Sequence, residues 1–266
     1  MREKKFAEKM KLLQNQLQRY GRVLIAFSGG KDSRFLLQTA VTTLGKANVY
    51  PYFARTSFVS SGARKRVDQQ KKMLEIPVRE ITLDYLKDRN LSRNPRQRCY
   101  LCKLKMFRAL LREAKRIGVT WIMDGSTVSD LNEYRPGREA LEKLGIVSPL
   151  KDAGIRSEEI VAHLRAAGIP EPFLVPSTCL ATRFPYGHRL IQDELTRMSL
   201  IENFLSARGI YPLRARFIPD GVRIETTAKN IPLILTSRAS LLKYCEKLKM
   251  KFVTLDIGGL KRGAWD

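Results

Sequence analysis

Short apolar runs alternate with longer amphipathic segments through the first half of the chain. Four of these runs have the length and composition of buried strands, at residues 23–27, 49–53, 78–83 and 121–123. In the segments beside them, apolar positions recur at helical spacing, which predicts helices over 6–19, 32–42, 62–74 and 103–117. This alternation predicts an α/β fold with a parallel, doubly wound sheet, whose ligands bind beyond the carboxyl ends of the strands.

The pattern changes after Tyr186 and Gly187. A helix is predicted over 192–208. A hairpin follows around Pro219 and Asp220, with strands over 213–218 and 221–226. The region ends with a helix over 230–249 and a strand over 252–255. This region is richer in strands than the alternation before it. We therefore predict an α/β domain over 1–187 and a smaller α+β domain over 188–266.

The first apolar run stops at two glycines and leads directly into a helix. Gly29 and Gly30 let the backbone turn tightly and approach a ligand without a Cβ in the way. The helix that follows presents free N–H groups and the positive end of its dipole to the same spot. With two hydroxyls, a lysine and a carboxylate for Mg²⁺ (Asp32), these residues form a phosphate-binding corner: Ser28, Gly29, Gly30, Lys31, Asp32 and Ser33.

The phosphate corner lacks the Walker spacing, Gly-x-x-x-x-Gly-Lys-Ser/Thr. Its sequence matches instead the PP-loop, Ser-Gly-Gly-x-Asp-Ser, of enzymes that cleave ATP between the α and β phosphates. Such enzymes leave AMP on a substrate oxygen and release pyrophosphate. The alternative is a plain glycine turn between strand and helix, and the full match after a buried strand favours the nucleotide site.

Composition indicates a globular protein of 266 residues with 44% hydrophobic content. No apolar stretch approaches the roughly 20 residues that span a bilayer, and the N-terminus lacks a signal-peptide pattern. We therefore expect a cytoplasmic protein with no membrane partner, whose cysteines are reduced. The net charge is +23, from 49 Lys and Arg against 26 Asp and Glu. It is consistent with polyanionic small molecules, with a nucleic acid, or with a merely cationic surface.

The four cysteines fall into two kinds. Cys99 and Cys102 form a Cys-x-x-Cys pair at the start of the predicted helix 103–117, and Cys179 follows much later. Cys245 lies inside a predicted helix, where we expect a buried small hydrophobe. The pair suits a redox dithiol, half of a zinc site completed from Cys179, Cys245, His163 and His188, or part of an iron–sulfur cluster. Because the chain also has the phosphate corner, we favour a [4Fe–4S] cluster on Cys99, Cys102 and Cys179. One iron of this cluster would be left open to bind sulfur.

Eight stretches, in order along nearly the whole chain, carry a family resemblance. They are residues 28–33, 98–103, 124–126, 130–137, 148–150, 179–187, 213–216 and 253–259. Together they resemble LarE, the ATP-dependent sulfur transferase family of nickel-pincer nucleotide biosynthesis, within the PP-loop (N-type ATP pyrophosphatase) superfamily. The Tyr-Arg-Pro-Gly of 134–137 and the Arg-Phe-Pro-Tyr-Gly of 183–187 are more particular to the family than the PP-loop. The three cysteines resemble its iron–sulfur type.

The resemblance implies a two-step reaction on pyridinium-3,5-biscarboxylic acid mononucleotide. Adenylation converts a poorly electrophilic carboxylate into a mixed anhydride, and sulfur then displaces AMP to give a thiocarboxylate. In members with a single site cysteine that cysteine is sacrificed, and it corresponds here to Cys179. Members that also have the Cys-x-x-Cys pair resemble cluster enzymes. We therefore expect ATP, Mg²⁺ and a [4Fe–4S] cluster, with sacrifice of Cys179 as the alternative.

The resemblance also implies roles for single residues. The phosphate corner, Gly125 and Ser126 would bind ATP, with Asp32 near Mg²⁺. Lys103 and Arg183 would neutralise phosphate or carboxylate charge. Substrate binding would use two arginines that share a face of one predicted strand and three acidic residues: Arg214, Arg216, Glu133, Glu202 and Glu225. A further family carboxylate has no counterpart in 229–235. The first domain would adenylate, and the second would bind substrate and form a homo-oligomer.

Other classes of protein would use some of the same residues. A PP-loop tRNA thiolase would combine the corner, three cysteines and a basic surface, and would bind tRNA in a salt-sensitive way. It would also bring an RNA-binding module, such as paired zinc motifs, which this sequence lacks. An amidating synthetase would use ammonia and would not need the three cysteines. A nucleotide-binding module without enzymatic activity would not need the carboxylate of Asp32. We therefore expect a pyridinium mononucleotide, ATP and sulfide or a sulfur donor as partners, and no nucleic acid.

Overall fold

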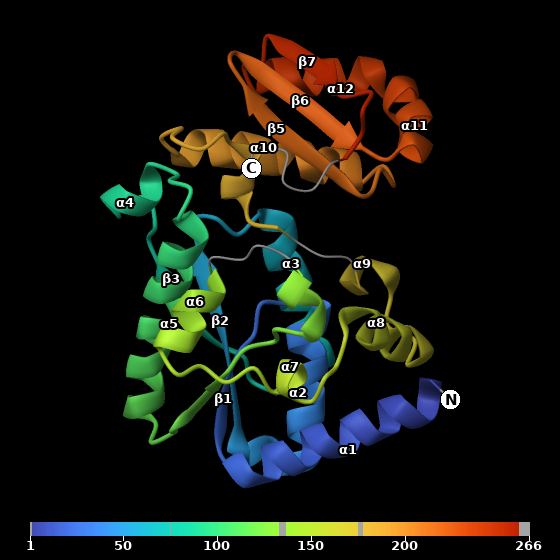
Figure 1. The fold of residues 1–266 in the computed structure, drawn as a ribbon. Helices are drawn as coiled ribbons and strands as arrows, with labels where there is room; N and C mark the ends of the chain where they lie inside the picture. The colour runs from blue at the N-terminus through green and yellow to red at the C-terminus, as the bar shows by residue number, and fades with distance from the viewer. Residues whose placement is uncertain (1, 75, 133–136, 175–177, 261–266) are drawn as a thin grey trace. The chain divides into compact units, whose positions relative to one another are not determined.

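The computed structural model describes residues 2–74, 76–132, 137–174 and 178–260 (Figure 1). The chain divides into two compact units, each with its own β-sheet. The first unit consists of Met1–Thr56, Lys65–Leu83 and Gln97–Ser177, and the second of Ser57–Arg64, Asp84–Arg96 and Thr178–Asp266. The domain boundary expected at residue 187 stays a prediction.

A four-stranded parallel sheet forms the centre of the first unit. Its strands follow the four predicted apolar runs closely: β1 (Val23–Ala26), β2 (Val49–Thr56), β3 (Arg79–Leu83) and β4 (Trp121–Met123). They lie in the order β3-β2-β1-β4, and every pair is parallel. The order places the switch in winding direction between β1 and β4, where an open α/β sheet binds its ligands. The prediction of a parallel α/β sheet is therefore confirmed.

Helices connect and flank these strands. The predicted helices appear as α1 (Arg2–Tyr20), α2 (Lys31–Leu44), α3 (Ser61–Met73) and α5 (Arg98–Arg116). Because crossovers between parallel strands are right-handed, α2 and α3 belong on one face of the sheet and α5 on the other. The segment after β4, for which the sequence predicted no element, holds short helices: η2 (Val128–Asn132), α6 (Gly137–Lys143), α7 (Pro149–Asp152), α8 (Ser157–Ala166) and α9 (Glu171–Leu174).

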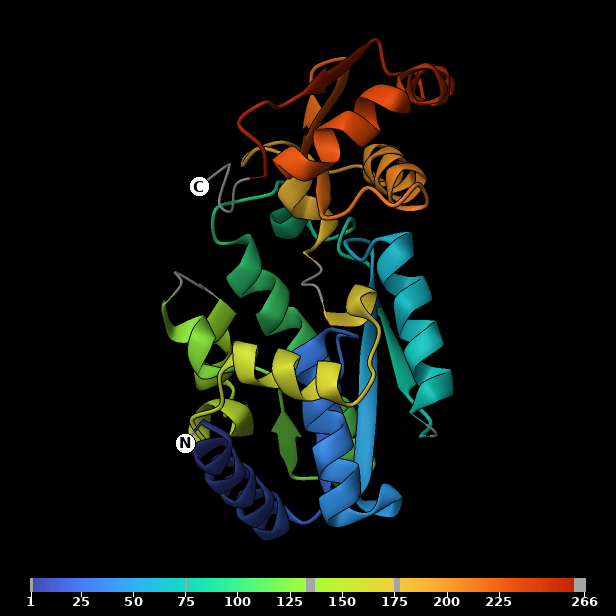
Figure 2. The ribbon, with the colours of Figure 1, turned by 90° about the vertical axis from the view of Figure 1, so that its right-hand side faces the viewer.

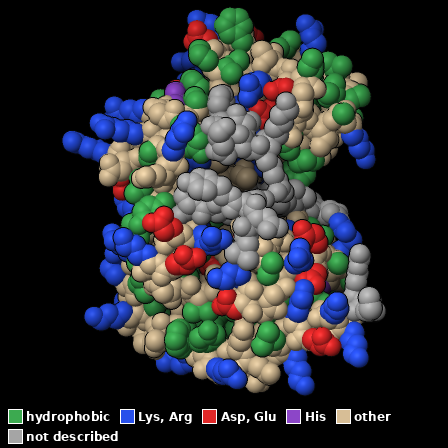
Figure 3. All heavy atoms as spheres, viewed as in Figure 1, with side chains coloured by type: hydrophobic (Ala, Val, Ile, Leu, Met, Phe, Trp, Pro, Cys, Tyr) green, Lys and Arg blue, Asp and Glu red, His purple; other side chains and the backbone are tan. Residues whose placement is uncertain are grey.

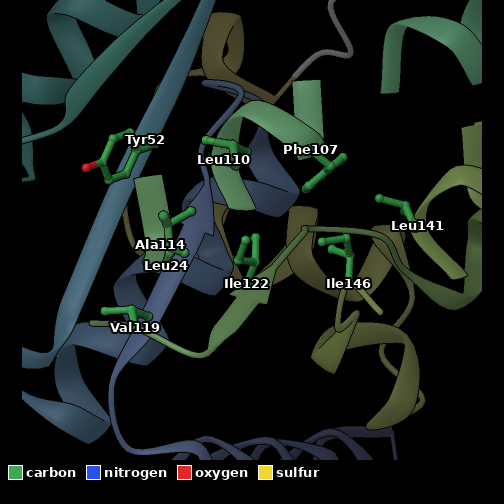
Figure 4. Packing of buried hydrophobic residues seen from close by; sticks show 9 residues of the cluster. All are labelled: Leu24, Tyr52, Phe107, Leu110, Ala114, Val119, Ile122, Leu141 and Ile146. Atoms are coloured by element: carbon green, nitrogen blue, oxygen red, sulfur yellow. The ribbon is translucent and has the colours of Figure 1, made fainter. Parts of the chain in front are cut away.

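The core beneath α5 shows how the sheet holds that helix. Leu24, Tyr52 and Ile122 of neighbouring strands belong to the same buried cluster as Phe107 and Leu110 of α5 (Figure 4). Each of these side chains is at most 2% exposed. Burial of such side chains contributes about 1.5–3 kcal/mol each, before the entropy of ordering is subtracted. This packing holds the middle of α5 against the sheet.

The second unit contains a three-stranded sheet. It consists of β5 (Leu213–Ile218), β6 (Gly221–Thr226) and β7 (Phe252–Leu255), in the order β5-β6-β7. The hairpin β5–β6 is antiparallel and turns at Pro219–Asp220, as predicted, while β7 pairs parallel to β6. The other elements are α4 (Arg89–Ser92), η3 (Leu180–Arg183), α10 (Gln192–Ser206), η4 (Ala228–Asn230), α11 (Ile231–Thr236) and α12 (Arg238–Lys247).

The single helix predicted over 230–249 is wrong, since two helices meet there at Ser237. Pro232 lies in the first turn of α11, where proline suits a helix start. At the break, the Thr236 hydroxyl donates to the Leu233 carbonyl and the Ser240 hydroxyl to the Ser237 carbonyl. Such hydroxyls compete with the backbone ladder, which a period of apolar residues does not reveal.

No described helix is both long enough and apolar enough to cross a membrane. Lys and Arg side chains lie over many elements of the face shown in Figure 3 rather than on a single one. The net charge of +23 thus does not by itself mark one ligand site.

Candidate functional site

The phosphate corner follows β1 at the carboxyl edge of the sheet. Gly29 has φ +74°, in the left-handed region, and a Cβ there would lie 2.3 Å from Cγ2 of Val67 on α3. The Gln70 amide Nε2 donates to the Gly29 carbonyl oxygen at 2.6 Å. Two independent constraints, backbone conformation and close packing, therefore require glycine at this position.

Hydroxyl groups brace the corner from inside. Ser28 and Ser33 place their Oγ atoms 3.0 Å apart, and the Ser33 hydroxyl also donates to the Gly30 carbonyl at 3.0 Å. Gly30 is the N-cap of α2, in extended conformation (φ −80°, ψ 159°), and no side chain of the described residues caps the helix there. The first-turn N–H groups of α2 are thus left to an external acceptor, as in anion sites at helix N-termini.

Lys31 and Asp32 interact directly at the start of α2. Lys31 Nζ lies 2.8 Å from Asp32 Oδ2 and also contacts the hydroxyl of Ser157, the first residue of α8. Ser157 donates to Asp32 Oδ1 at 3.1 Å. In keeping with these contacts, α8 lies against α2 (Figures 1 and 2).

The environment of Asp32 suits a cation. Burial raises the pKa of this carboxyl above its ordinary value, against the opposing charge and hydrogen bond of Lys31, and the nearby charge of Asp130 raises it further. A buried carboxylate beside a second acidic group is stabilised in its ionised form by a positive ion. Asp32 and Asp130 therefore provide carboxylate oxygens of the kind that Mg²⁺ takes as ligands beside a phosphate chain.

The loop after β4 meets the phosphate corner. A Cβ on Gly125 would lie 2.8 Å from the backbone nitrogen of Ser33 and 3.1 Å from the carbonyl carbon of Asp32. No other residue type would fit without moving the start of α2. Gly125 thus lets the loop after β4 lie directly against the segment after β1. This is the arrangement expected of a site at the carboxyl edge of the sheet.

Asp124 organises the same loop from within. It is 4% exposed and accepts hydrogen bonds from the Ser148 hydroxyl (2.7 Å), the Ser126 hydroxyl (2.7 Å) and Lys103 Nζ (3.3 Å). Burial raises its pKa, but Lys103 and the serine hydrogen bonds outweigh burial and hold the pKa below the ordinary value. Lys103, predicted as a catalytic cation, is therefore linked through its ion pair with Asp124 to the loop that touches the phosphate corner.

The Cys-x-x-Cys pair lies at the start of α5. The helix begins at Arg98, five residues before the predicted start at 103, so Cys99 and Cys102 are three apart on one helical face. Cys99 is exposed and Cys102 is partly exposed. Lys103 follows directly and joins this turn to Asp124, so the pair, the β4 loop and the phosphate corner belong to one continuous set of contacts in the first unit.

Cys179 caps the short helix η3 in the second unit, and its thiol is exposed. Its carbonyl oxygen accepts from the Thr182 hydroxyl at 2.7 Å and from Arg183 Nη1 at 3.3 Å. The Arg183 guanidinium is buried and donates through Nε (2.6 Å) and Nη2 (3.0 Å) to the two oxygens of Glu202 on α10. The Cys179 loop is thereby held rigidly while its thiol faces outward.

Arg214 and Arg216 share one face of β5, as predicted, but differ in their partners. Arg216 donates to Glu225 at 2.8 Å and to the Thr182 carbonyl at 2.7 Å, and Arg223 also donates to Glu225 at 2.9 Å. Arg214 donates to its neighbour's carbonyl and forms no ion pair with a described residue. Burial, and then the charge of Arg183, lower its pKa. Of the two, Arg214 is the guanidinium open to an anionic ligand.

The two units divide the predicted site residues between them. The phosphate corner, Gly125, Ser126, Lys103, Cys99 and Cys102 lie in the first unit, and Cys179, Arg183, Glu202, Arg214, Arg216 and Glu225 in the second. The convergence of the three thiols stays a prediction. Glu133 lies outside the described residues. Among the described residues, no three His, Cys, Asp or Glu side chains gather as a ready metal site.

Two residues that shape these sites, Asp124 and Ser157, have no role predicted from the sequence. The place of Asp124 directly after a strand puts it at the carboxyl edge of the sheet, but its motif alone gave no role for its carboxylate. Ser157 contacts Asp32 across 125 residues of sequence, and nothing local marks it. Cys245 is fully buried, as predicted, and burial raises the pKa of its thiol to about 11.

No protein-family model matches the chain. It is 32% identical to the pyridinium-3,5-bisthiocarboxylic acid mononucleotide synthase of Lactiplantibacillus plantarum, over 91% of this chain and 88% of that protein. It is 29% identical to an uncharacterized protein of Synechocystis, over 94% of this chain and 95% of that one. An uncharacterized protein of Methanocaldococcus jannaschii is also 29% identical, over 95% and 97% respectively. Identity of this extent to the synthase, over most of both chains, shows that this chain belongs to the LarE family.

Proposed function

We propose that the protein is an ATP-dependent sulfur transferase that converts a carboxylate of pyridinium-3,5-biscarboxylic acid mononucleotide into a thiocarboxylate. The observation that supports it most directly is the 32% identity to the synthase, together with an uncapped helix start behind the Ser-Gly-Gly-Lys-Asp-Ser corner. The relative's name supplies the substrate class, and the corner supplies a means of activating it.

The first step proposed is adenylation. The substrate carboxylate oxygen attacks the α phosphorus of ATP, the bond from this phosphorus to the bridging β oxygen breaks, and pyrophosphate leaves with the electron pair. The N–H groups at the start of α2 bind the phosphate chain, and Lys31 adds a positive charge beside it. Gly29 and Gly125 allow the corner to pack closely against Val67 and the β4 loop to pack against the start of α2, which keeps the corner in shape.

Asp32 is the proposed ligand of Mg²⁺. When bound, the ion would neutralise phosphate charge and orient the chain for attack at the α phosphorus. A single protein carboxylate suffices, since Mg²⁺ in phosphate sites usually keeps water and substrate oxygens as its other ligands. The raised pKa of Asp32 and the proximity of Asp130 fit such an ion. Lys31 would move from Asp32 toward the phosphates when the ion binds.

The second proposed step is sulfur transfer. Sulfide attacks the carbonyl carbon of the acyl-adenylate, the bond to the AMP oxygen breaks, and AMP leaves. Cys99, Cys102 and Cys179 would hold the [4Fe–4S] cluster, and all three thiols are at least partly exposed. When bound, the cluster would offer an open iron to which hydrosulfide attaches. In the alternative, the Cys179 thiolate attacks the carbonyl carbon of the acyl-adenylate and AMP leaves; loss of the Cys179 Cα proton then breaks the Cβ–S bond, so that the thiocarboxylate leaves with the sulfur and dehydroalanine stays in the chain.

The second unit is proposed to bind the substrate's own phosphate. Arg214 has the open guanidinium, and a bidentate fork suits a phosphate group. Glu202 and Glu225 accept from Arg183 and Arg216, so they fix the direction of the neighbouring cations. We propose further that the chain functions as a homo-oligomer in the cytoplasm.

The decisive experiment is anaerobic purification with iron and sulfide analysis. Wild type, Cys99→Ala, Cys102→Ala and Cys179→Ala are compared, with the buried-thiol variant Cys245→Ala as matched control. We expect iron and sulfide in wild type and control, and loss in the other three. Wild type that stays iron-free after reconstitution removes the cluster. Several turnovers per chain with external sulfide exclude sacrifice, and loss of hydrogen sulfide mass at Cys179 establishes it.

A further inference from the structure

The sheet of the first unit carries arginine and tyrosine side chains at its amino edge, opposite the edge with the phosphate corner. Tyr50 of β2 is partly exposed, and two exposed guanidinium groups lie over its ring. The Cζ atom of Arg22, directly before β1, is 5.4 Å from the ring centroid, and that of Arg79, the first residue of β3, is 5.3 Å from it. The Arg22 Nη2 also donates to the Tyr50 hydroxyl at 2.8 Å.

The same set of contacts continues from β3 to the end of α5. The Cζ atom of Arg79 lies 5.9 Å from the ring centroid of Tyr52, and its Nη1 donates to the Tyr52 hydroxyl at 3.4 Å. That hydroxyl donates to Glu113 at 3.3 Å, and Arg116 donates to the same carboxylate at 2.8 Å. Each member thus contacts the next in what we term the arginine–tyrosine row: Arg22, Tyr50, Arg79, Tyr52, Glu113 and Arg116.

The row has more positive charge than its own carboxylate balances. Three arginines share one acidic partner, Glu113, whose pKa is lowered, chiefly by its hydrogen bond from Arg116. Arg22 and Arg79 donate to tyrosine hydroxyls and form no ion pair with a described residue. Like charges held along one surface repel each other unless an anion joins them. The row therefore suits a ligand with several negative charges.

Other residues of the amino edge extend this surface. Arg19 precedes β1, Lys46 precedes β2 and Lys115 precedes β4, and all three are exposed. Trp121, the first residue of β4, is 40% exposed. Tyr20 packs against it in a T-shaped pair, with ring centroids 4.8 Å apart. The amino edge thus combines exposed cations with an aromatic ring that is open to solvent.

This combination favours a single-stranded nucleic acid over other polyanions. A guanidinium binds phosphate through a planar fork, and unpaired bases stack on aromatic rings and on guanidinium planes. Reading a duplex takes a helix or a two-stranded ribbon in the groove, whereas the row is spread over three strands and a helix end. A membrane surface would be met by apolar side chains beside the cations, and the row contains only arginine, tyrosine and one glutamate.

We infer that the arginine–tyrosine row binds a single-stranded nucleic acid, with its three guanidinium groups on phosphates and Trp121 stacked on a base. The row lies at the start of β1 and the phosphate corner at its end, so the strand is a partner held away from the adenylation site, not the substrate. The sequence predicts no nucleic acid because it holds no RNA-binding module. The row is assembled from four distant segments, so no local motif marks it.

Fluorescence anisotropy of a labelled oligouridylate tests the inference. Arg22→Gln/Arg79→Gln/Arg116→Gln should bind about tenfold more weakly than wild type, or worse, as expected for lost hydrogen bonds to charged groups. Each phosphate contact contributes about 0.7 to the slope of log affinity against log salt, so this variant should lose about 2 units of slope. Tyr50→Leu keeps the net charge but removes the ring beneath two guanidinium groups, and it should also weaken binding.

Arg238→Gln/Lys243→Gln/Lys247→Gln is the matched control. It removes the same charge from three exposed residues of α12 in the second unit, and it should bind the oligouridylate nearly as wild type does. An equal loss in this control overturns the inference, as does full affinity in the row variant. Wild type that does not bind the strand overturns it too. So does wild type that binds a duplex or phosphatidylserine vesicles as tightly as the strand.

Oligothymidylate distinguishes the two kinds of strand. Tighter binding of oligouridylate supports an RNA partner, read through the 2′-hydroxyl, and equal binding supports a single strand of either kind. If the triple row variant does not fold, Arg22→Gln compared with Arg238→Gln makes the same test at one exposed residue each. ATP binding should be unchanged in all these variants, so failure of the inference leaves the proposed function intact.

Discussion

Arg183 and Glu202 form a bidentate ion pair between η3 and α10, with N···O distances of 2.6 and 3.0 Å. Their side chains are 3% and 13% exposed, so solvent screens the pair weakly. Glu202 also accepts from the backbone N–H of Ala215 on β5 at 3.0 Å. A residue predicted to contact substrate thus joins the Cys179 loop to both the helix and the sheet of the second unit.

Loss of Glu202 alone should therefore destabilise the protein strongly. Glu202→Ala leaves the Arg183 guanidinium buried without its partner, and the free energy of unfolding should fall by about 3–5 kcal/mol. The double variant Arg183→Met/Glu202→Ala should lose less than the sum of the two single variants, because no unpaired charge is left. Urea denaturation of the four proteins measures the coupling. Additive losses would mean that the two side chains do not stabilise each other.

Gly29→Ala should destabilise the phosphate corner more than a backbone effect alone explains. A left-handed conformation costs alanine about 1–2 kcal/mol, and the Cβ would also overlap Val67. Gly118→Ala is the matched control, since Gly118 has φ +66° and no atom within 4 Å of the added Cβ. Urea denaturation should show a larger loss for Gly29→Ala than for Gly118→Ala. Equal losses would show that the contact with Val67 relaxes freely.

Elements with strong local signals are the ones that the sequence predicted well. The hairpin β5–β6 follows the predicted bounds because Pro219 and Asp220 specify a turn, and Asp220 has φ +56°. The short helices α6, α7 and α9 lack two full turns of apolar spacing, so no period distinguishes them from loops. Tertiary packing, rather than local preference, decides those segments.

The site shows the same division between local and distant determinants. The phosphate corner is a run of covalent neighbours, so its residue types and order identify it. The contact of Asp32 with Ser157 depends on where α8 packs. A sequence gives residue types and spacing along the chain, but an ion pair between distant segments appears only once the helices are placed.

The stability contributed by Asp124 should depend on pH in the acid range. Its folded pKa lies below the ordinary value of about 3.9, so the unfolded chain binds the proton first as pH falls. The contribution is therefore complete above about pH 5 and is lost as pH falls through the folded pKa. Wild type should exceed Asp124→Asn in unfolding free energy at pH 6, and the difference should shrink below pH 4.

Asp193→Asn is the control for this pH series. Asp193 is an exposed carboxylate of α10 that pairs with Arg197 in the next turn. Exposed pairs of this kind contribute about 0.3–0.5 kcal/mol, so this variant should follow wild type at every pH. A constant difference between wild type and Asp124→Asn from pH 6 to pH 3 would contradict the assigned pKa direction.

Thiol alkylation of iron-free protein should separate the four cysteines. At pH 8, Cys99 and Cys179 should react because both are exposed, while Cys245 should not. Cys245 is fully buried and its pKa is raised to about 11, so both access and thiolate fraction are small. Iodoacetamide labelling followed by peptide mass analysis measures each site. In urea all four should react, which controls for the reagent, and folded-state labelling of Cys245 at the rate of Cys99 would contradict its burial on α12.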